Sequence, residues 1–116
     1  METKFGRLLR RKRQEAGKTM GDLAKFLDVS VPYISDVERG NRKAFPEDRI
    51  MAIAGFLSTA PYDLIVAAAE DGGEYRLQFF QNHPKRAQVG AALMRRWTGL
   101  TDEQLIEIEK ILGRQE

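Results

Sequence analysis

The chain has 116 residues, with 19 Lys and Arg, 17 Asp and Glu, one His and no Cys. This length fits about one domain with a small added element. The lack of Cys excludes a disulfide framework, a thiolate nucleophile and a Cys-based zinc or iron–sulfur site. No apolar run approaches the roughly 18–20 residues of a membrane span, and no signal peptide opens the chain, so we expect a cytoplasmic protein with no membrane partner.

Charge is distributed unevenly along the chain. Residues 1–43 carry 11 basic and 6 acidic side chains, whereas residues 44–116 carry 8 basic and 11 acidic ones. A basic front part and an acidic rear part indicate that one end of the protein meets a polyanion and the other does not.

Apolar spacing predicts five helices in the front part of the chain. The predicted positions are about 3–16, 20–27 and 30–39, followed by one helix that begins at Pro46 and one that begins near Pro61. Thr19 and Ser30 are suitable N-caps for the second and third helices, and Ser58 or Thr59 for the fifth. The sequence Asp71-Gly72-Gly73 is the clearest break in the chain.

The tail beyond this break has a different pattern. Residues 72–84 predict a linker or a short strand, because apolar and polar residues alternate over 74–80. Residues 85–116 predict a helical hairpin, whose second helix opens with a capping box formed by Thr101 and Gln104. Its two helices carry more apolar surface than a lone hairpin can hide. These apolar residues are Val89, Leu93, Trp97, Leu105, Ile108, Ile111 and Leu112.

The stretch from Thr19 to Gly40 has the pattern of two short helices that cross at a tight turn. Ala24 supplies a small side chain where the helices cross, and Val29 supplies a buried hydrophobe in the turn. Ser30 caps the second helix and Ile34 faces inward. The first helix leaves its N-terminus free to hold an anion such as phosphate.

These residues resemble the lambda-repressor-like, or Xre-type, helix-turn-helix regulators. The matching string is Thr19-x-x-x-Leu23-Ala24-x-x-Leu27-x-Val29-Ser30-x-x-Tyr33-Ile34-Ser35-x-x-Glu38-Arg39-Gly40, followed by a basic Asn41-Arg42-Lys43 loop. The resemblance covers about residues 3–69. It implies an all-α fold, with a five-helix DNA-binding domain over residues 1–71. The chain departs from the pattern at Met20, where many members have Gln.

The resemblance also implies that the second helix of the motif enters the major groove of double-stranded DNA. The base-facing positions would be Val31, Pro32, Ser35 and Asp36. Phosphate contacts would come from Thr19, the Met20 backbone amide, Tyr33, Asn41, Arg42 and Lys43. Arg13 and Glu38 match a family pair that joins the first helix to the end of the recognition helix. Few of the base-facing side chains can form strong hydrogen bonds with base edges. We therefore hypothesise that DNA shape and deformability supply part of the specificity.

Several of these residues have a second interpretation. Asp36 could pair with a local cation instead of a base, and Tyr33 could be an aromatic residue at the core edge with its hydroxyl in solvent. The basic run over 10–13 could contact phosphate or form a solvated helix face. His83 lies in a turn, and the acidic residues near the last helix complement its dipole, so we expect neither a metal site nor a cofactor. Ser30 and Ser35 have no His partner, which argues against catalysis.

The sequence therefore predicts a dimeric DNA-binding transcriptional regulator that is not an enzyme. One recognition helix binds one half-site, and a homodimer formed through the apolar tail residues would bind a pseudo-palindromic operator. We expect a repressor. The alternative is an antitoxin-type protein, whose tail binds a second protein while its front part regulates its own transcription.

Overall fold

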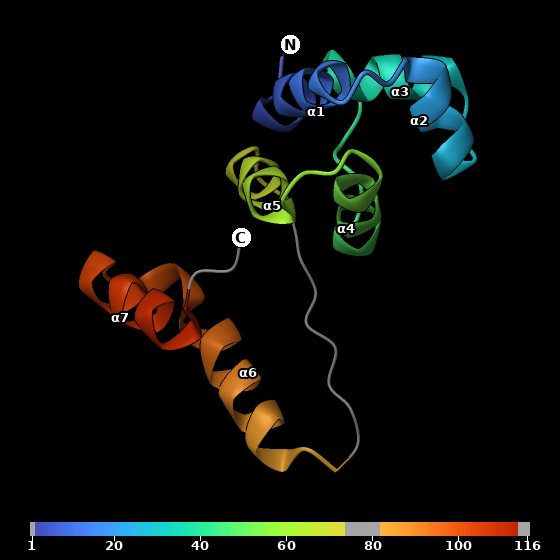
Figure 1. The fold of residues 1–116 in the computed structure, drawn as a ribbon. Helices are drawn as coiled ribbons and strands as arrows, with labels where there is room; N and C mark the ends of the chain where they lie inside the picture. The colour runs from blue at the N-terminus through green and yellow to red at the C-terminus, as the bar shows by residue number, and fades with distance from the viewer. Residues whose placement is uncertain (1, 74–81, 114–116) are drawn as a thin grey trace. The chain divides into compact units, whose positions relative to one another are not determined.

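The computed structural model describes residues 2–73 and 82–113. Within these residues the chain is helical and has no strand, which confirms the all-α prediction (Figure 1). The elements in chain order are α1 (Lys4–Glu15), α2 (Met20–Leu27), α3 (Val31–Glu38), α4 (Glu47–Phe56), α5 (Pro61–Glu70), α6 (Pro84–Arg96), the 3₁₀ helix η1 (Trp97–Gly99) and α7 (Asp102–Leu112). The strand predicted over 74–80 lies outside the described residues.

The chain divides into two compact units, which we call unit 1 (Met1–Gly73) and unit 2 (Glu74–Gln115). In unit 1, α1 packs against α3 and α5, α2 packs against α3 and α4, and α4 packs against α5. The side chains at the centre of this arrangement are fully buried and apolar. They include Phe5, Leu9, Leu23, Ile34, Ile50, Ile53 and Leu64. All five helices therefore share one core, which fixes the position of α3 relative to α1 and α2.

The start of α1 is tied to the end of α5. Thr3 caps α1 through its hydroxyl oxygen, which accepts a hydrogen bond from the Gly6 amide at 2.9 Å. Two further amides of the first turn, those of Lys4 and Phe5, donate to the two carboxylate oxygens of Asp71, each at 2.9 Å. The carboxylate satisfies amides that have no partner within the helix and complements the helix dipole. It also closes unit 1 by joining its two ends.

Gly6 allows α1 to lie close to the backbone of α3. A Cβ atom at this position would lie 2.5 Å from the carbonyl oxygen of Val37 and 2.7 Å from that of Glu38. Both atoms belong to the backbone, so a larger residue would push the two helices apart. The C-terminal end of α3 is therefore held directly against the first helix.

The predicted cap of α5 is wrong. Its N-cap is Ala60, which makes no side-chain hydrogen bond, and neither Ser58 nor Thr59 caps the helix. Both residues instead belong to the turn that ends α4, because the Ser58 amide donates to the Gly55 carbonyl at 3.2 Å and the Thr59 amide to the Ala54 carbonyl at 2.9 Å. Pro61 at the first helical position begins α5 with its fixed φ, and it has no amide that needs a cap.

Unit 2 contains α6, η1 and α7. Thr101 and Gln104 form the predicted capping box of α7, with hydrogen bonds of 3.0 and 3.2 Å between side chain and backbone. The seven apolar residues predicted from the sequence to form the dimer contact are exposed or half-buried in this unit. Val89, Trp97, Leu105, Ile111 and Leu112 are exposed, and Leu93 and Ile108 are half-buried.

Candidate nucleic-acid interface

The two helices α2 and α3 are each defined by an N-cap that the sequence predicts. The Thr19 hydroxyl oxygen accepts from the Asp22 amide at 3.0 Å, and the Asp22 carboxylate accepts from the Thr19 amide at 2.9 Å. In α3 the Ser30 hydroxyl oxygen accepts from the Tyr33 amide at 3.2 Å. These caps fix where each helix begins, and therefore which residues of α3 face outward.

The turn between α2 and α3 is short because Asp28 takes a left-handed conformation. Its φ is 57° and its ψ is 48°, values that Asp tolerates better than most residues. Its amide and that of Val29 donate to the last carbonyls of α2. Ala24 is buried on α2, and its small side chain permits the close crossing with α3.

The four positions predicted to face bases lie along the outward side of α3. Val31 is 46% exposed, Pro32 is also exposed, and Ser35 and Asp36 are half-buried. The opposite side of α3 is buried in unit 1 through Ile34. The outward side of α3 is therefore open to contact with another molecule.

Asp36 has a local cation as its partner. Its carboxylate accepts a hydrogen bond from the Arg39 guanidinium at 3.2 Å, one turn along α3. Both side chains are accessible, with 63% of Arg39 and 37% of Asp36 exposed. Arg39 was not singled out as a site residue in the sequence. Its spacing of three from Asp36 on the exposed side of α3 is the signal that could have identified it.

Arg13 and Glu38 form a buried ion pair between α1 and the last residue of α3. The Arg13 Nε and one terminal nitrogen donate to the two carboxylate oxygens of Glu38 at 2.7 and 3.0 Å. The other terminal nitrogen donates to the Lys18 carbonyl at 2.9 Å. Hydrogen bonding to Glu38 raises the pKa of Arg13, although burial opposes this shift. All the described buried polar atoms of the pair have partners, so it fixes α3 against α1 in one geometry.

A row of stacked side chains supports the basic loop after α3. The Arg42 guanidinium lies over the ring of Tyr33, 4.2 Å from the ring centre. Tyr33 in turn stacks on Phe45 with centroids 5.7 Å apart, and Phe45 meets Phe5 edge to face in the core. The Arg42 charge is therefore held beside α3 by a cation–π contact. The ring of Tyr33 therefore lies at the edge of the core, one of the two positions interpreted for it from the sequence, whereas its contacts with Arg42 and Phe45 were not predicted.

The other residues predicted to contact phosphate lie in the basic loop and at the start of α2. Asn41 and Lys43 are exposed in the loop, and Thr19 is exposed at the start of α2. The Thr19 hydroxyl is engaged with Asp22, because its oxygen accepts the Asp22 amide and its hydrogen bond to the Asp22 carboxylate lowers the pKa of that group. Met20 is half-buried, and its side chain packs against the core.

The Asp22 carboxylate occupies part of the α2 N-terminus. The hydrogen bond from the Thr19 backbone, and then that from its side chain, lower the pKa of Asp22, and nearby Lys18 and Lys25 act in the same direction. Asp22 is therefore charged at neutral pH. A phosphate at this end of α2 would have to lie beside this carboxylate, which weakens the N-terminus of α2 as an anion site.

Comparison with known proteins identifies this arrangement. Residues 9–64 match the family model described as helix-turn-helix, which spans most of α1 and reaches into α5. Residues 9–64 form a lambda-repressor-like helix-turn-helix domain. The domain is that of a DNA-binding transcription regulator. No curated protein matches the chain.

Two features are absent from the residues that the structure describes. No helix among them is both long and apolar enough to cross a membrane. No group of three or more His, Asp or Glu side chains in the same part of the chain is placed to hold a metal ion.

Proposed function

We propose that the protein is a sequence-specific regulator that represses transcription by occupying a pseudo-palindromic operator as a homodimer. The observation that carries this proposal is the juxtaposition of two surfaces in unit 1. The outward side of α3 presents Val31, Pro32 and Ser35, and directly beside it the Tyr33 ring holds the Arg42 charge.

The proposed division of labour follows from the chemistry of these groups. Arg42, Lys43 and Asn41 bind phosphate and set the register of the protein on the duplex. Val31 and Pro32 contact thymine methyl groups, and Ser35 hydrogen-bonds an exposed base edge. Arg13 and Glu38 hold α3 in place while these contacts form.

Asp36 has a modified role in this proposal. A carboxylate accepts a hydrogen bond from cytosine N4, but the carboxylate of Asp36 also binds Arg39. The pair can approach a base step together, because the Arg39 charge offsets the repulsion between Asp36 and phosphate. Since the outward side of α3 has few polar side chains that can hydrogen-bond bases, DNA shape and deformability supply part of the specificity.

Repression and dimerisation follow from the size of the DNA-binding surface. One short recognition helix reads only a half-site, and a second copy doubles the contacts. A bound dimer that covers a promoter blocks transcription without any further domain. The exposed apolar residues of unit 2, above all Ile111 and Leu112, are available to hold the copies together. The same residues keep one alternative open, an antitoxin-type protein whose unit 2 binds a different protein.

Selection of bound duplexes from a random pool tests this proposal. We expect two inverted half-sites whose centres lie about 34 Å apart, or a multiple of that distance. Sedimentation of the free protein should give a dimer. Selection of a single unpaired half-site, or of no sequence at all, would contradict the proposal. Co-purification of a neighbouring gene product in place of a second copy would favour the antitoxin.

A further inference from the structure

Unit 2 leaves its apolar side chains without cover. Val89 is 60% exposed, Trp97 58% and Ile111 82%. Among the described elements of unit 2, α6 packs against η1, which directly follows it in the chain, and no other pair packs closely. Each of the two long helices therefore has an apolar side that still needs a partner.

The two helices carry opposite charges. In α6, whose sequence is PKRAQVGAALMRR, four residues are basic and none is acidic. In α7, whose sequence is DEQLIEIEKIL, four residues are acidic and one is basic. The two helices therefore attract each other electrostatically if their charged residues lie beside the apolar sides that come into contact.

On each helix the charges border the apolar side. Arg86 and Arg96 lie three residues before Val89 and three residues after Leu93, which places them on the same face of α6. Arg95 lies on the opposite face of that helix. In α7, Glu109 follows Leu105 by four residues, so it borders the apolar side in the same way.

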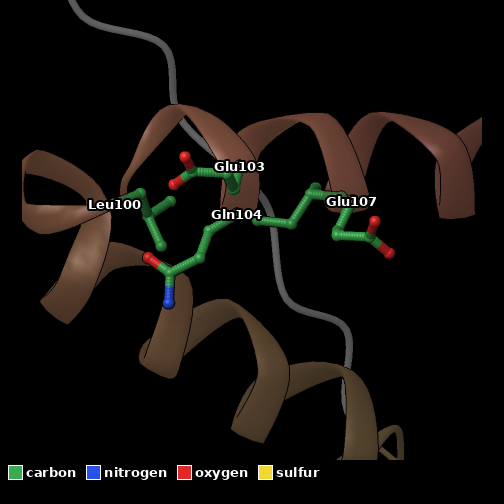
Figure 2. A pocket seen from close by; sticks show the side chains of 5 residues that line it. Leu100, Glu103, Gln104 and Glu107 are labelled. Atoms are coloured by element: carbon green, nitrogen blue, oxygen red, sulfur yellow. The ribbon is translucent and has the colours of Figure 1, made fainter.

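A groove beside α7 has the same combination of surfaces. Its lining includes the apolar side chains of Leu100 and Ile108 together with Glu103 and Glu107. Figure 2 shows Glu103 and Glu107, the two acidic residues of this lining, spaced along α7. This shallow, open surface is therefore complementary in polarity and charge to a helix with an apolar face and basic residues at its border, which is the description of α6.

We propose that unit 2 pairs with a second copy of itself by exchange, so that α6 of each protomer packs against α7 of its partner. This contact rests on the homodimer proposed above and specifies how it is built. Two-fold symmetry generates the α6–α7 contact twice, and each time it places Arg86 and Arg96 near the acidic border of the partner's α7. Pairing α6 with α6 and α7 with α7 would place like charges together in both contacts.

Charge reversal tests the exchange in the full-length protein. The first variant carries Arg86→Glu and Arg96→Glu, and the second carries Glu107→Lys and Glu109→Lys. Because every reversed contact occurs twice in a dimer, we expect each variant alone to dimerise about 30-fold more weakly or worse. An equimolar mixture of the two should recover native affinity as a heterodimer. The control, Arg95→Glu, should dimerise like the native protein.

Sedimentation equilibrium measures all of these affinities, and its outcomes separate the two proposals. A native protein that is monomeric overturns both the homodimer and the exchange. A native dimer whose affinity is unchanged by the reversals overturns the exchange alone. The same holds if the two reversed variants are weakened but their mixture recovers nothing, because matched α6–α7 pairs would then have no effect.

Discussion

Removal of Arg13 should destabilise unit 1 far more than removal of any surface arginine. The Glu38 side chain is 1% exposed, and in the Arg13→Met variant its carboxylate would be buried without a partner. Breaking a buried pair in this way costs about 3–5 kcal/mol. Glu38→Leu should cost a similar amount, because it leaves the guanidinium uncompensated.

The double variant Arg13→Met/Glu38→Leu distinguishes the energy of the ion pair itself from the cost of leaving one buried charge without its partner. Both charges are gone, so the cost of burying them disappears together with their attraction. What remains is the lost hydrogen bond from Arg13 to the Lys18 carbonyl, worth about 1 kcal/mol. The double variant should therefore be more stable than either single one, with a coupling energy of several kcal/mol.

Urea denaturation of the full-length protein, followed by its helical signal, measures these energies. The matched control is Arg7→Met, since Arg7 pairs with Glu2 at 3.9 Å on the surface, where both side chains are more than half exposed. This control should cost less than about 1 kcal/mol. The reasoning is refuted if Arg13→Met costs no more than the control, or if the double variant loses the sum of the two single losses.

Three further changes test separate contacts of unit 1. Gly6→Ala should destabilise the protein by about 1–3 kcal/mol, because the added Cβ meets the α3 backbone. Gly55→Ala, which has open space around it, should instead stabilise it by about 0.5–1 kcal/mol; thermal unfolding of both variants checks the opposite signs. Asp71→Ala should cost about 1–2 kcal/mol because two amides of α1 lose their acceptor, whereas Glu70→Gln, which removes only an exposed ion pair, should cost less than about 0.5 kcal/mol. Equal urea midpoints for these two variants would contradict the assigned role of the carboxylate. Since the folded-state pKa of Asp22 is lowered, the stability that its charge adds is complete above its ordinary value of 3.8 and is lost as the pH falls through the folded-state pKa. The difference in unfolding free energy between native protein and Asp22→Asn should therefore shrink in acid, and a difference that stays constant with pH would refute this.

Local signals in the sequence predicted several helix starts in both units. The caps at Thr19, Ser30 and Thr101 lie one residue before helices that the apolar spacing also indicates, so two independent signals agree on each boundary. The cap of α5 was predicted wrongly because two candidates, Ser58 and Thr59, precede the helix, and the sequence does not show that both are needed to end α4.

Contacts between distant residues could not be predicted in this way. Asp71 was interpreted as part of a break, yet it accepts amides that lie 66 and 67 residues earlier in the chain. Likewise Tyr33 was expected either to contact phosphate or to lie at the core edge, but neither interpretation included the stacking of its ring against Arg42 and Phe45. Such contacts depend on how the helices pack, and a single sequence carries no direct record of that packing.

The most direct test of the account compares two variants on the same panel of duplexes. The panel consists of a selected site and its single-base variants, and the measured quantity is the dissociation constant at several salt concentrations. We expect Arg42→Ala to weaken binding to all members about equally and to lower the salt slope by about 1. We expect Ser35→Ala to change the order of preference at one or two base positions. The account is contradicted if the native protein binds no duplex at low ionic strength, or if Ser35→Ala leaves the order of preference unchanged.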